Sequence, residues 1–179
     1  MHGESLAPEL AAPLVDTATA LERIYGRHCD DVYRIALRYG GGRREWAEDV
    51  VQDVFLVLAG KLASLDDHDA LMGWLYRTTT RRCLNRLESE RFRELFPQWL
   101  QHLGLHEPSQ PDAIVAARGE VDRALAALAK LPPKERVAFA MYRLDERPVL
   151  EIARTIGHSK GYVSKLITRA EARLAKVLR

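Results

Sequence analysis

The segment Gly40–Leu65, GGGRREWAEDVVQDVFLVLAGKLASL, predicts a helix with two different faces. At about 100° per residue, its large apolar side chains share one arc: Trp46, Val50, Val54, Val57, Leu58 and Leu62. The opposite arc carries Glu45, Glu48, Asp49, Gln52 and Asp53. Leu56 lies inside this polar arc. It is either an ordinary surface leucine or the apolar centre of a partner-binding patch, and the pattern alone leaves both interpretations open.

Outward from this segment, helical periodicity continues through almost the whole chain. We therefore expect an all-α fold of two small helical domains joined by a linker. The expected divisions are an N-terminal tail over 1–18, a first domain over 19–95, a linker over 96–117 and a second domain over 118–179. A helix over 19–39 is expected to direct inward Leu21, Ile24, Tyr25, Val32, Ile35 and Ala36.

Composition places the chain among folded, soluble proteins. Its 179 residues are 47% hydrophobic and 29% charged, and the formal net charge is +2. Cys29 and Cys83 are too few for a disulfide framework, and the N-terminus lacks the pattern of a signal peptide. Because no apolar run is long enough to span a bilayer, we expect a cytoplasmic protein without direct membrane insertion.

The sequence contains no recognisable enzyme motif. There is no phosphate-binding loop and no G-x-S-x-G nucleophile motif. His102 and His106 are four residues apart, but no carboxylate or cysteine joins them in a metal motif, so we interpret them as a chance pair. We expect no catalytic residue, no metal and no cofactor.

A second predicted helix, over 70–93, carries a basic face. One side combines an aromatic residue with cationic and hydrogen-bonding residues: Trp74, Arg77, Thr78, Arg81 and Asn85. The inward side is expected to contain Tyr76, Cys83, Leu84 and Leu87. An exposed tryptophan among arginines suits single-stranded nucleic acid, because bases stack on the ring and arginines bind phosphates. The alternative is a solvated arginine face with Trp74 packed partly against a neighbouring helix.

The C-terminal residues predict two helices joined by a tight turn. Pro148 starts the first, whose inward side is expected to contain Leu150, Ile152, Ala153 and Ile156. Gly157 provides the turn. The second helix offers polar and basic residues at its tip and outer side: Ser159, Lys160, Tyr162, Ser164, Lys165, Thr168 and Arg169. This pattern is typical of a helix-turn-helix that reads the major groove, and the alternative is an ordinary helical hairpin with a basic face.

Three segments, in this order, resemble the extracytoplasmic-function sigma factors of bacterial RNA polymerase. AEDVVQDVF, from Ala47, resembles the core-binding motif of the family's region 2. WLYRTTTRRCLN, from Trp74, resembles the helix that melts and reads the downstream promoter element. The segment that begins LPPKER, from Leu131, resembles region 4, which reads the upstream element. The resemblance covers nearly the whole chain from Leu21 to Leu178.

This resemblance implies a function. The chain would bind core polymerase and direct it to specific promoters, recognising the −35 element through region 4 and melting the −10 element through region 2. Catalysis would belong to the core enzyme. The implied polymerase contacts are the clamp of the largest subunit and a flap of the second-largest subunit. Many relatives are held inactive by an anti-sigma factor, often at the inner membrane, and such a partner is implied only by the family.

The resemblance also assigns roles to residues. The implied clamp-binding positions are Asp49, Gln52, Asp53 and Phe55, with Leu56 as an apolar contact among them. The implied contacts to the non-template strand of the −10 element are Trp74, Arg77, Thr78, Arg81 and Asn85. The implied contacts to the −35 element lie at the tip and outer side of the last helix: Ser159, Lys160, Tyr162, Ser164, Lys165, Thr168 and Arg169.

Two segments depart from the family pattern. The loop SLDDHD, from Ser64, is acidic where many relatives are aromatic, basic or glycine-containing, so the preferred downstream base is undetermined. The linker is apolar, and we expect Trp99, Leu100, Leu103 and Leu105 to pack on one of the two domains.

Two other classes of protein compete with the sigma-factor interpretation. A stand-alone transcriptional regulator would bind an operator through the C-terminal helices and use the first domain to sense or dimerise. A helical scaffold would bind only protein. The acidic helix followed by the Trp/Arg helix distinguishes the sigma factor, because a sensor bundle needs neither.

Overall fold

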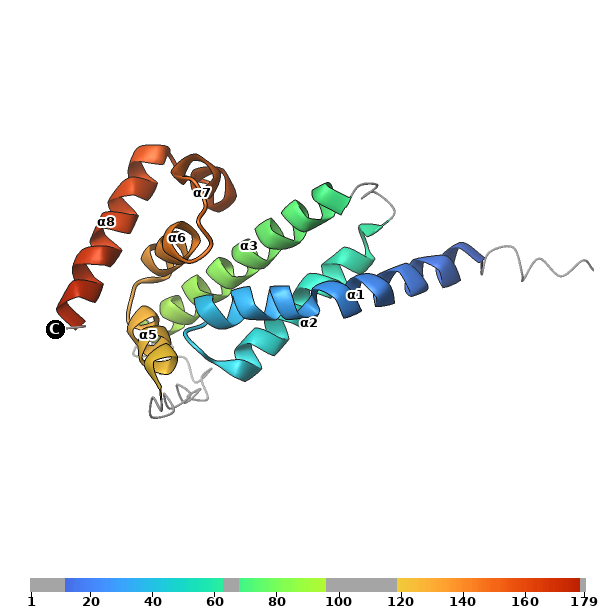
Figure 1. The fold of residues 1–179 in the computed structure, drawn as a ribbon, viewed down its shortest axis with the longest axis horizontal. Coiled ribbons are helices and arrows are strands. Elements are labelled where there is room, and N and C mark those ends of the chain that lie inside the picture. Colours follow the sequence, from blue (N-terminus) through green and yellow to red (C-terminus); the bar gives the residue numbers. More distant parts are fainter. Residues whose placement is uncertain (1–11, 63–67, 96–118, 178–179) are drawn as a thin grey trace, which may run out of the picture.

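The computed structural model describes residues 12–62, 68–95 and 119–177, and every regular element in these ranges is a helix. The all-α prediction is therefore confirmed. Figure 1 shows an N-terminal bundle and a C-terminal unit that pack against each other. The N-terminal bundle comprises α1 (Ala12–Tyr39), α2 (Arg44–Ala59) and α3 (His68–Leu95). The C-terminal unit comprises α5 (Glu120–Ala129), α6 (Pro133–Arg143), α7 (Val149–Ile156) and α8 (Lys160–Val177).

The apolar arc of α2 forms the centre of the N-terminal bundle. Val50, Val54 and Leu58 are fully buried between α1 and α3. Burial of each such side chain contributes roughly 1.5–3 kcal/mol, so this arc fixes the rotation of α2 about its axis. The opposite, polar arc must then face away from the bundle.

Helix α1 differs from its prediction in two places. It begins at Ala12, inside the stretch expected to be a loose tail. Pro13 lies in its first turn, where a proline costs no intrahelical hydrogen bond, so the proline did not indicate a loop. The inward prediction for Tyr25 was also wrong, because this side chain is 47% exposed. Its ring instead covers Phe55, with the two ring centroids 4.8 Å apart at an edge-to-face angle.

Helices α7 and α8 form the predicted helix-turn-helix. Gly157 ends α7 with a φ of 73°, a left-handed conformation that costs glycine little. The Tyr162 amide donates a hydrogen bond to Ser159 Oγ (3.3 Å), so Ser159 caps α8. The inward prediction for Leu150 was wrong, because this residue in the first turn of α7 is 51% exposed.

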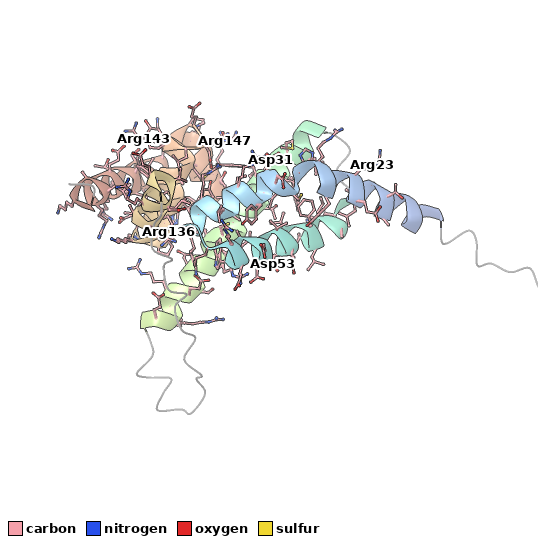
Figure 2. All side chains as sticks on the ribbon, turned by 60° about the horizontal axis from the view of Figure 1, so that its bottom comes forward. Arg23, Asp31, Asp53, Arg136, Arg143 and Arg147 are labelled. Atoms are coloured by element: carbon pink, nitrogen blue, oxygen red, sulfur yellow. The ribbon has the colours of Figure 1, made fainter. Side chains whose placement is uncertain are left out.

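The two parts of the molecule meet where α6 lies beside α1 and α3. Arg136 of α6 is buried at this junction, and Figure 2 shows its side chain there. Its guanidinium donates hydrogen bonds to the Tyr39 carbonyl (3.2 Å), the Leu131 carbonyl (3.1 Å) and the Ala129 carbonyl. Burial lowers the pKa of Arg136 to about 10, so the group is still charged at neutral pH and its three carbonyl partners compensate its lost hydration.

Several predictions concern segments outside the described residues. These are the packing of the linker residues Trp99 to Leu105, the His102/His106 pair and the acidic loop after Ser64.

Candidate nucleic-acid and protein interfaces

The outer face of α2 presents one large apolar side chain among polar ones. Leu56 is 73% exposed, while Gln52 is exposed and Asp53 is half-buried. Figure 2 shows Asp53 pointing away from the other helices. We call Asp49, Gln52, Asp53 and Leu56 the acidic face. An apolar centre with carboxylates around it suits a protein partner that carries arginines or lysines.

Phe55, the fifth predicted core-binding residue, does not join the acidic face. It is only 6% exposed and packs in the core beneath the Tyr25 ring. The helical wheel explains this position, because residue 55 lies one turn from the buried Val51 and Leu58, at the edge of the apolar arc. Tyr25, which the wheel of α1 had assigned to the interior, is instead the exposed aromatic residue next to Phe55.

A network of polar contacts fixes the N-terminal half of α2 against α3. Glu90 of α3 accepts hydrogen bonds from Trp46 Nε1 (2.6 Å) and from Arg43 Nη2 (2.9 Å). Arg86 of α3 donates to Asp49 Oδ2 (2.5 Å), and its guanidinium lies over the Trp46 ring. Asp49 is therefore already paired within the bundle, which leaves Asp53 as the more available carboxylate of the acidic face.

Helix α3 presents a row of polar residues along its outer side. Arg77, Arg81 and Asn85 recur every fourth position and are all exposed. Thr78 and Trp74 are half-buried, and Trp74 packs partly against the core. The inward prediction for this helix is confirmed, since four side chains are buried: Tyr76, Cys83, Leu84 and Leu87. We call Arg77, Arg81 and Asn85 the α3 row.

The middle residue of the α3 row contacts the C-terminal unit. Arg81 Nε donates a hydrogen bond to the carbonyl oxygen of Thr155, at 3.0 Å. Thr155 belongs to the last turn of α7, where the helix macrodipole is negative and favours a cation. A side chain predicted to contact nucleic acid is thus held by the helix-turn-helix.

The outer side of α8 is exposed as predicted. The exposed residues are Ser159, Lys160, Tyr162, Ser164, Lys165, Thr168 and Arg169. The His158 ring packs on the Tyr162 ring, with centroids 4.7 Å apart, and orients the tyrosine at the tip of the helix. Ser164 Oγ donates to the Lys160 carbonyl (3.1 Å). The basic residues Lys165 and Arg169 lie one turn apart, at a spacing that suits contacts along a DNA groove.

The sequence did not reveal one further polar cluster at the junction. The Asp145 carboxylate, in the turn between α6 and α7, accepts hydrogen bonds from three donors of the N-terminal bundle. The donors are Arg38 Nη2 (2.5 Å), Tyr39 OH (2.6 Å) and Tyr76 OH (2.8 Å). The only signal in the sequence was that buried tyrosine hydroxyls need an acceptor. Helical periodicity cannot identify an acceptor about 70 to 107 residues away.

The described ranges contain neither a metal-binding cluster nor a membrane-spanning helix. No group of three or more His, Cys, Asp or Glu residues there could hold a metal ion. None of the helices in residues 12–62, 68–95 and 119–177 is long and apolar enough to cross a membrane. An open cleft of about 1020 Å³ at the junction is lined by residues of both charge signs, among them Arg43, Glu90 and Lys130. This mixture does not indicate one class of small ligand.

Both halves of the chain match models of one protein family. The model for sigma-70 region 2 matches residues 24–93, which lie in the N-terminal bundle. The model for sigma-70 region 4 matches residues 122–174, which lie in the C-terminal unit. The acidic face and the α3 row fall within the first match, and the outer residues of α8 fall within the second.

Relatives and solved structures agree with these matches. The ECF RNA polymerase sigma factor SigM of Mycobacterium tuberculosis is 29% identical over 99% of this chain and 86% of its own length. The ECF RNA polymerase sigma factor SigE of Mycolicibacterium smegmatis is 28% identical over 88% of this chain and 61% of its own length. Two solved structures share the fold. The sigma factor RpoE of Bartonella quintana, in complex with the anti-sigma factor NepR, has a TM-score of 0.60 at 19% identity and covers 88% of this chain and 95% of its own. CnrH, in complex with the cytosolic domain of CnrY, has a TM-score of 0.56 at 24% identity. The match covers 90% of this chain and 88% of CnrH.

Proposed function

Because this chain belongs to the sigma-70 family as an extracytoplasmic-function sigma factor, we propose that it performs the family's task through three separate surfaces. The acidic face of α2 binds the clamp of core RNA polymerase. The α3 row binds the non-template strand of the −10 element. The outer side of α8 binds the −35 duplex. As a specificity subunit the chain is non-catalytic, and phosphodiester chemistry belongs to the core enzyme, with no cofactor on this chain.

The exposure of Leu56 is the observation that carries the polymerase contact. Leaving a leucine 73% exposed on a helix whose other large apolar residues are buried or half-buried gains nothing for the folded chain. Around it, Gln52 and Asp53 supply acceptors for basic residues of a partner. A central apolar contact within a polar rim is the usual anatomy of a protein interface.

The two DNA surfaces differ in what they offer. Arg77, Arg81 and Asn85 on α3 combine phosphate-binding cations with an amide that can hydrogen-bond a base edge. Thr78 and Trp74 lie half-buried beside them and would contact the strand at the edge of this row. On α8, Lys165 and Arg169 would bind the upstream duplex, with the other exposed residues of that side as further contacts.

The remaining partners follow from the family alone. The C-terminal unit would also bind the flap of the second-largest polymerase subunit. An anti-sigma factor would hold the protein inactive in the cytoplasm or, if that partner is membrane-bound, at the inner membrane. Free DNA binding should be weak, because each DNA surface is small and full specificity needs both tethered on the polymerase.

The first test of the proposal is a binding titration of the labelled protein with bacterial core RNA polymerase, without DNA. Binding is measured by fluorescence anisotropy. We expect saturable binding, and we expect Leu56→Glu to raise the Kd at least about thirtyfold, the effect of losing a central interface residue. The matched control is Val121→Glu on α5, because Val121 is 72% exposed and lies outside the acidic face. Absence of binding by the wild type to core enzyme from a closely related bacterium would overturn the proposal and favour the stand-alone regulator.

A further inference from the structure

Two aromatic rings pack on each other at the start of the last helix. The ring centroids of His158 and Tyr162 are 4.7 Å apart, and the ring planes are tilted by 46°. His158 belongs to the turn between α7 and α8, and Tyr162 belongs to the first turn of α8. We call these two residues the aromatic tip. Figure 1 shows the turn between α7 and α8 at the outer end of the C-terminal unit, away from α1 and α2.

The backbone on both sides of this ring contact is fixed by hydrogen bonds. The His158 amide donates to the Ala153 carbonyl (2.9 Å), in a turn that the left-handed conformation of Gly157 makes possible. The Tyr162 amide donates to Ser159 Oγ (3.3 Å) at the start of α8. Because the His158 ring packs against it, the Tyr162 ring is held in one orientation. A side chain that is already ordered loses little entropy when it contacts a partner.

The aromatic tip is open to another molecule. Tyr162 is 37% exposed, and His158 is half-buried. The residue before Tyr162 is Gly161, which has no side chain. A Cβ atom added to Gly161 would meet no atom of the described residues within 4 Å. A second molecule can therefore approach the backbone of α8 closely beside the Tyr162 ring.

Tyr162 lies at the end of a row of basic residues. Tyr162, Lys165 and Arg169 follow one another at spacings of three and four residues, so they share one side of α8, and all three are exposed. In a helix-turn-helix, the N-terminal part of the second helix contacts base edges in the major groove. The two cations can bind phosphates or guanine, whereas a ring packed on another ring offers mainly apolar surface.

The major groove contains one apolar group that such a surface can recognise. Thymine presents a methyl group at C5, and the other base edges present hydrogen-bond donors and acceptors. The alternative contact for Tyr162 is a hydrogen bond from its hydroxyl to a phosphate, which does not distinguish bases. Packing by His158 favours the methyl contact, because close apolar packing needs a ring of fixed position, whereas a hydroxyl on a freely turning ring can still reach a phosphate.

We propose that the aromatic tip recognises the 5-methyl group of a thymine in the −35 element, with Tyr162 as the contacting residue and His158 as a positioning residue. This inference rests on the proposed function, since it assumes that α8 binds the −35 duplex. It adds a base preference to a surface that otherwise consists of cations and hydroxyl groups. Burial of one methyl group should raise the affinity for DNA about fourfold.

The decisive experiment removes single methyl groups from the DNA. Holoenzyme first transcribes fragmented genomic DNA of its own bacterium, and sequencing of the 5′ ends of the transcripts identifies its promoters. Each thymine of one upstream element is then replaced, one at a time, by deoxyuridine, which forms the same base pair but lacks the methyl group. In competition titrations with wild-type holoenzyme, we expect the affinity to fall about fourfold at one of these thymines.

Variants then assign this loss to the aromatic tip. Holoenzyme with Tyr162→Ala should bind the thymine and deoxyuridine duplexes equally, and Tyr162→Phe should keep the preference because the ring remains. His158→Ala should weaken the preference, and His158→Phe should restore it because a ring again packs on Tyr162. The matched control is Tyr142→Ala, because Tyr142 is 38% exposed but lies on α6. This control should keep the whole preference for thymine.

Several results would overturn the inference. If no deoxyuridine substitution lowers the affinity, there is no methyl contact. If Tyr162→Phe loses affinity equally for both duplexes, the hydroxyl of Tyr162 binds a phosphate. If Tyr162→Ala keeps the preference, other residues of α8 recognise the methyl group. If His158→Phe behaves like His158→Ala, His158 does not act by packing on the tyrosine ring.

Failure of the proposed function would look different. If Lys165→Ala with Arg169→Ala leaves the affinity for the unmodified promoter unchanged, α8 does not bind the −35 duplex, and the proposed function fails at this surface. If that double variant loses affinity but no deoxyuridine substitution matters, only the inference about the aromatic tip fails. Core polymerase binding by each variant should equal that of the wild type, and this measurement shows that the variant is folded. The deoxyuridine series uses the wild-type protein, so it decides the question even if a variant does not fold.

Discussion

Helices α2 and α8 follow the same rule on their buried sides and opposite rules on their exposed sides. Val50 and Val54 of α2 are fully buried, as are Val163 and Ala170 of α8. Outside, α2 carries carboxylates around Leu56, whereas α8 carries lysine, arginine and hydroxyl groups. The buried stripe determines where each helix packs, and the exposed residues determine which partner it can bind.

The two exposed faces also differ in how much binding energy one residue can carry. The acidic face has a single large apolar side chain, so a partner's interface would depend on that one contact and the charges beside it. The α8 face has several polar residues of similar reach, and DNA contacts of this type add roughly independently. Substitutions should therefore have concentrated effects on α2 and distributed effects on α8.

The largest effect is expected for Asp53→Arg with Leu56→Glu. This pair removes the apolar centre and reverses a neighbouring charge, so core polymerase affinity should fall at least about 100-fold in a fluorescence anisotropy titration. Binding of the full-length variant to duplex DNA at low salt should equal that of the wild type, because α8 is unaltered. Transcription at the wild-type level by this variant would show that the acidic face is not the polymerase contact.

An intermediate effect is expected for Lys165→Ala with Arg169→Ala. Each cation should contact one phosphate or base edge, so affinity for upstream promoter duplex should fall about 10–30-fold. The slope of log K against log salt should decrease by about 2. Core polymerase binding should not change. The measurement is a salt series of duplex binding by holoenzyme at promoters identified by transcript sequencing.

The control for this prediction removes two cations elsewhere. Arg44→Ala with Lys130→Ala alters two exposed residues beside the junction cleft and changes the net charge by the same amount. An equal loss of duplex affinity in both double variants would mean that net charge, and not the α8 face, determines binding.

The contrast between the buried and the exposed sides of the helices explains what the sequence could predict. Periodicity identified the buried stripes of α2, α3 and α8, because a stripe is a local property of one helix. It failed at Tyr25 and Leu150, which lie near the ends of buried stripes, where neighbouring elements decide whether a side chain is covered. The family resemblance, not periodicity, assigned Phe55 to the polymerase contact, although that side chain turns to the core. The exposed faces were thus predicted in outline. Individual residues were placed correctly only near the centre of each face.

The polar cluster around Asp145 could not be predicted from the sequence. Asp145 lies in a turn, without any periodic pattern, and its donors are far away in the chain. The sequence predicted Tyr76 only as an ordinary inward aromatic residue, and Tyr39 only as the end of the first helix. What makes them a unit is the packing of one half on the other, which local patterns do not encode. Contacts between domains belong to this class.

The smallest effect is expected at this junction, for Tyr76→Phe. The ring and its contact with Arg147 remain, while the hydroxyl that donates to Asp145 (2.8 Å) is lost. Loss of one hydrogen bond to a charged acceptor should lower the free energy of unfolding by about 1–2 kcal/mol at pH 7, measured by urea denaturation. The polar cluster around Asp145 thus differs from both exposed faces, because substitution within it changes the stability of the chain.

The difference in free energy of unfolding between the wild type and Tyr76→Phe should depend on pH if the Tyr76 hydroxyl is buried. Burial raises the pKa of Tyr76 above its usual value near 10, so the folded protein retains the phenol proton at a pH where the unfolded chain loses it. The stabilisation from Tyr76 is then fully present below pH 10 and is lost as the pH rises through the folded pKa, by about 1.4 kcal/mol per pH unit. The difference in free energy of unfolding between the wild type and Tyr76→Phe should therefore become smaller above pH 10. A difference between the two proteins that stays constant above pH 10 would mean that the Tyr76 phenol is open to water and that the two halves separate readily in solution.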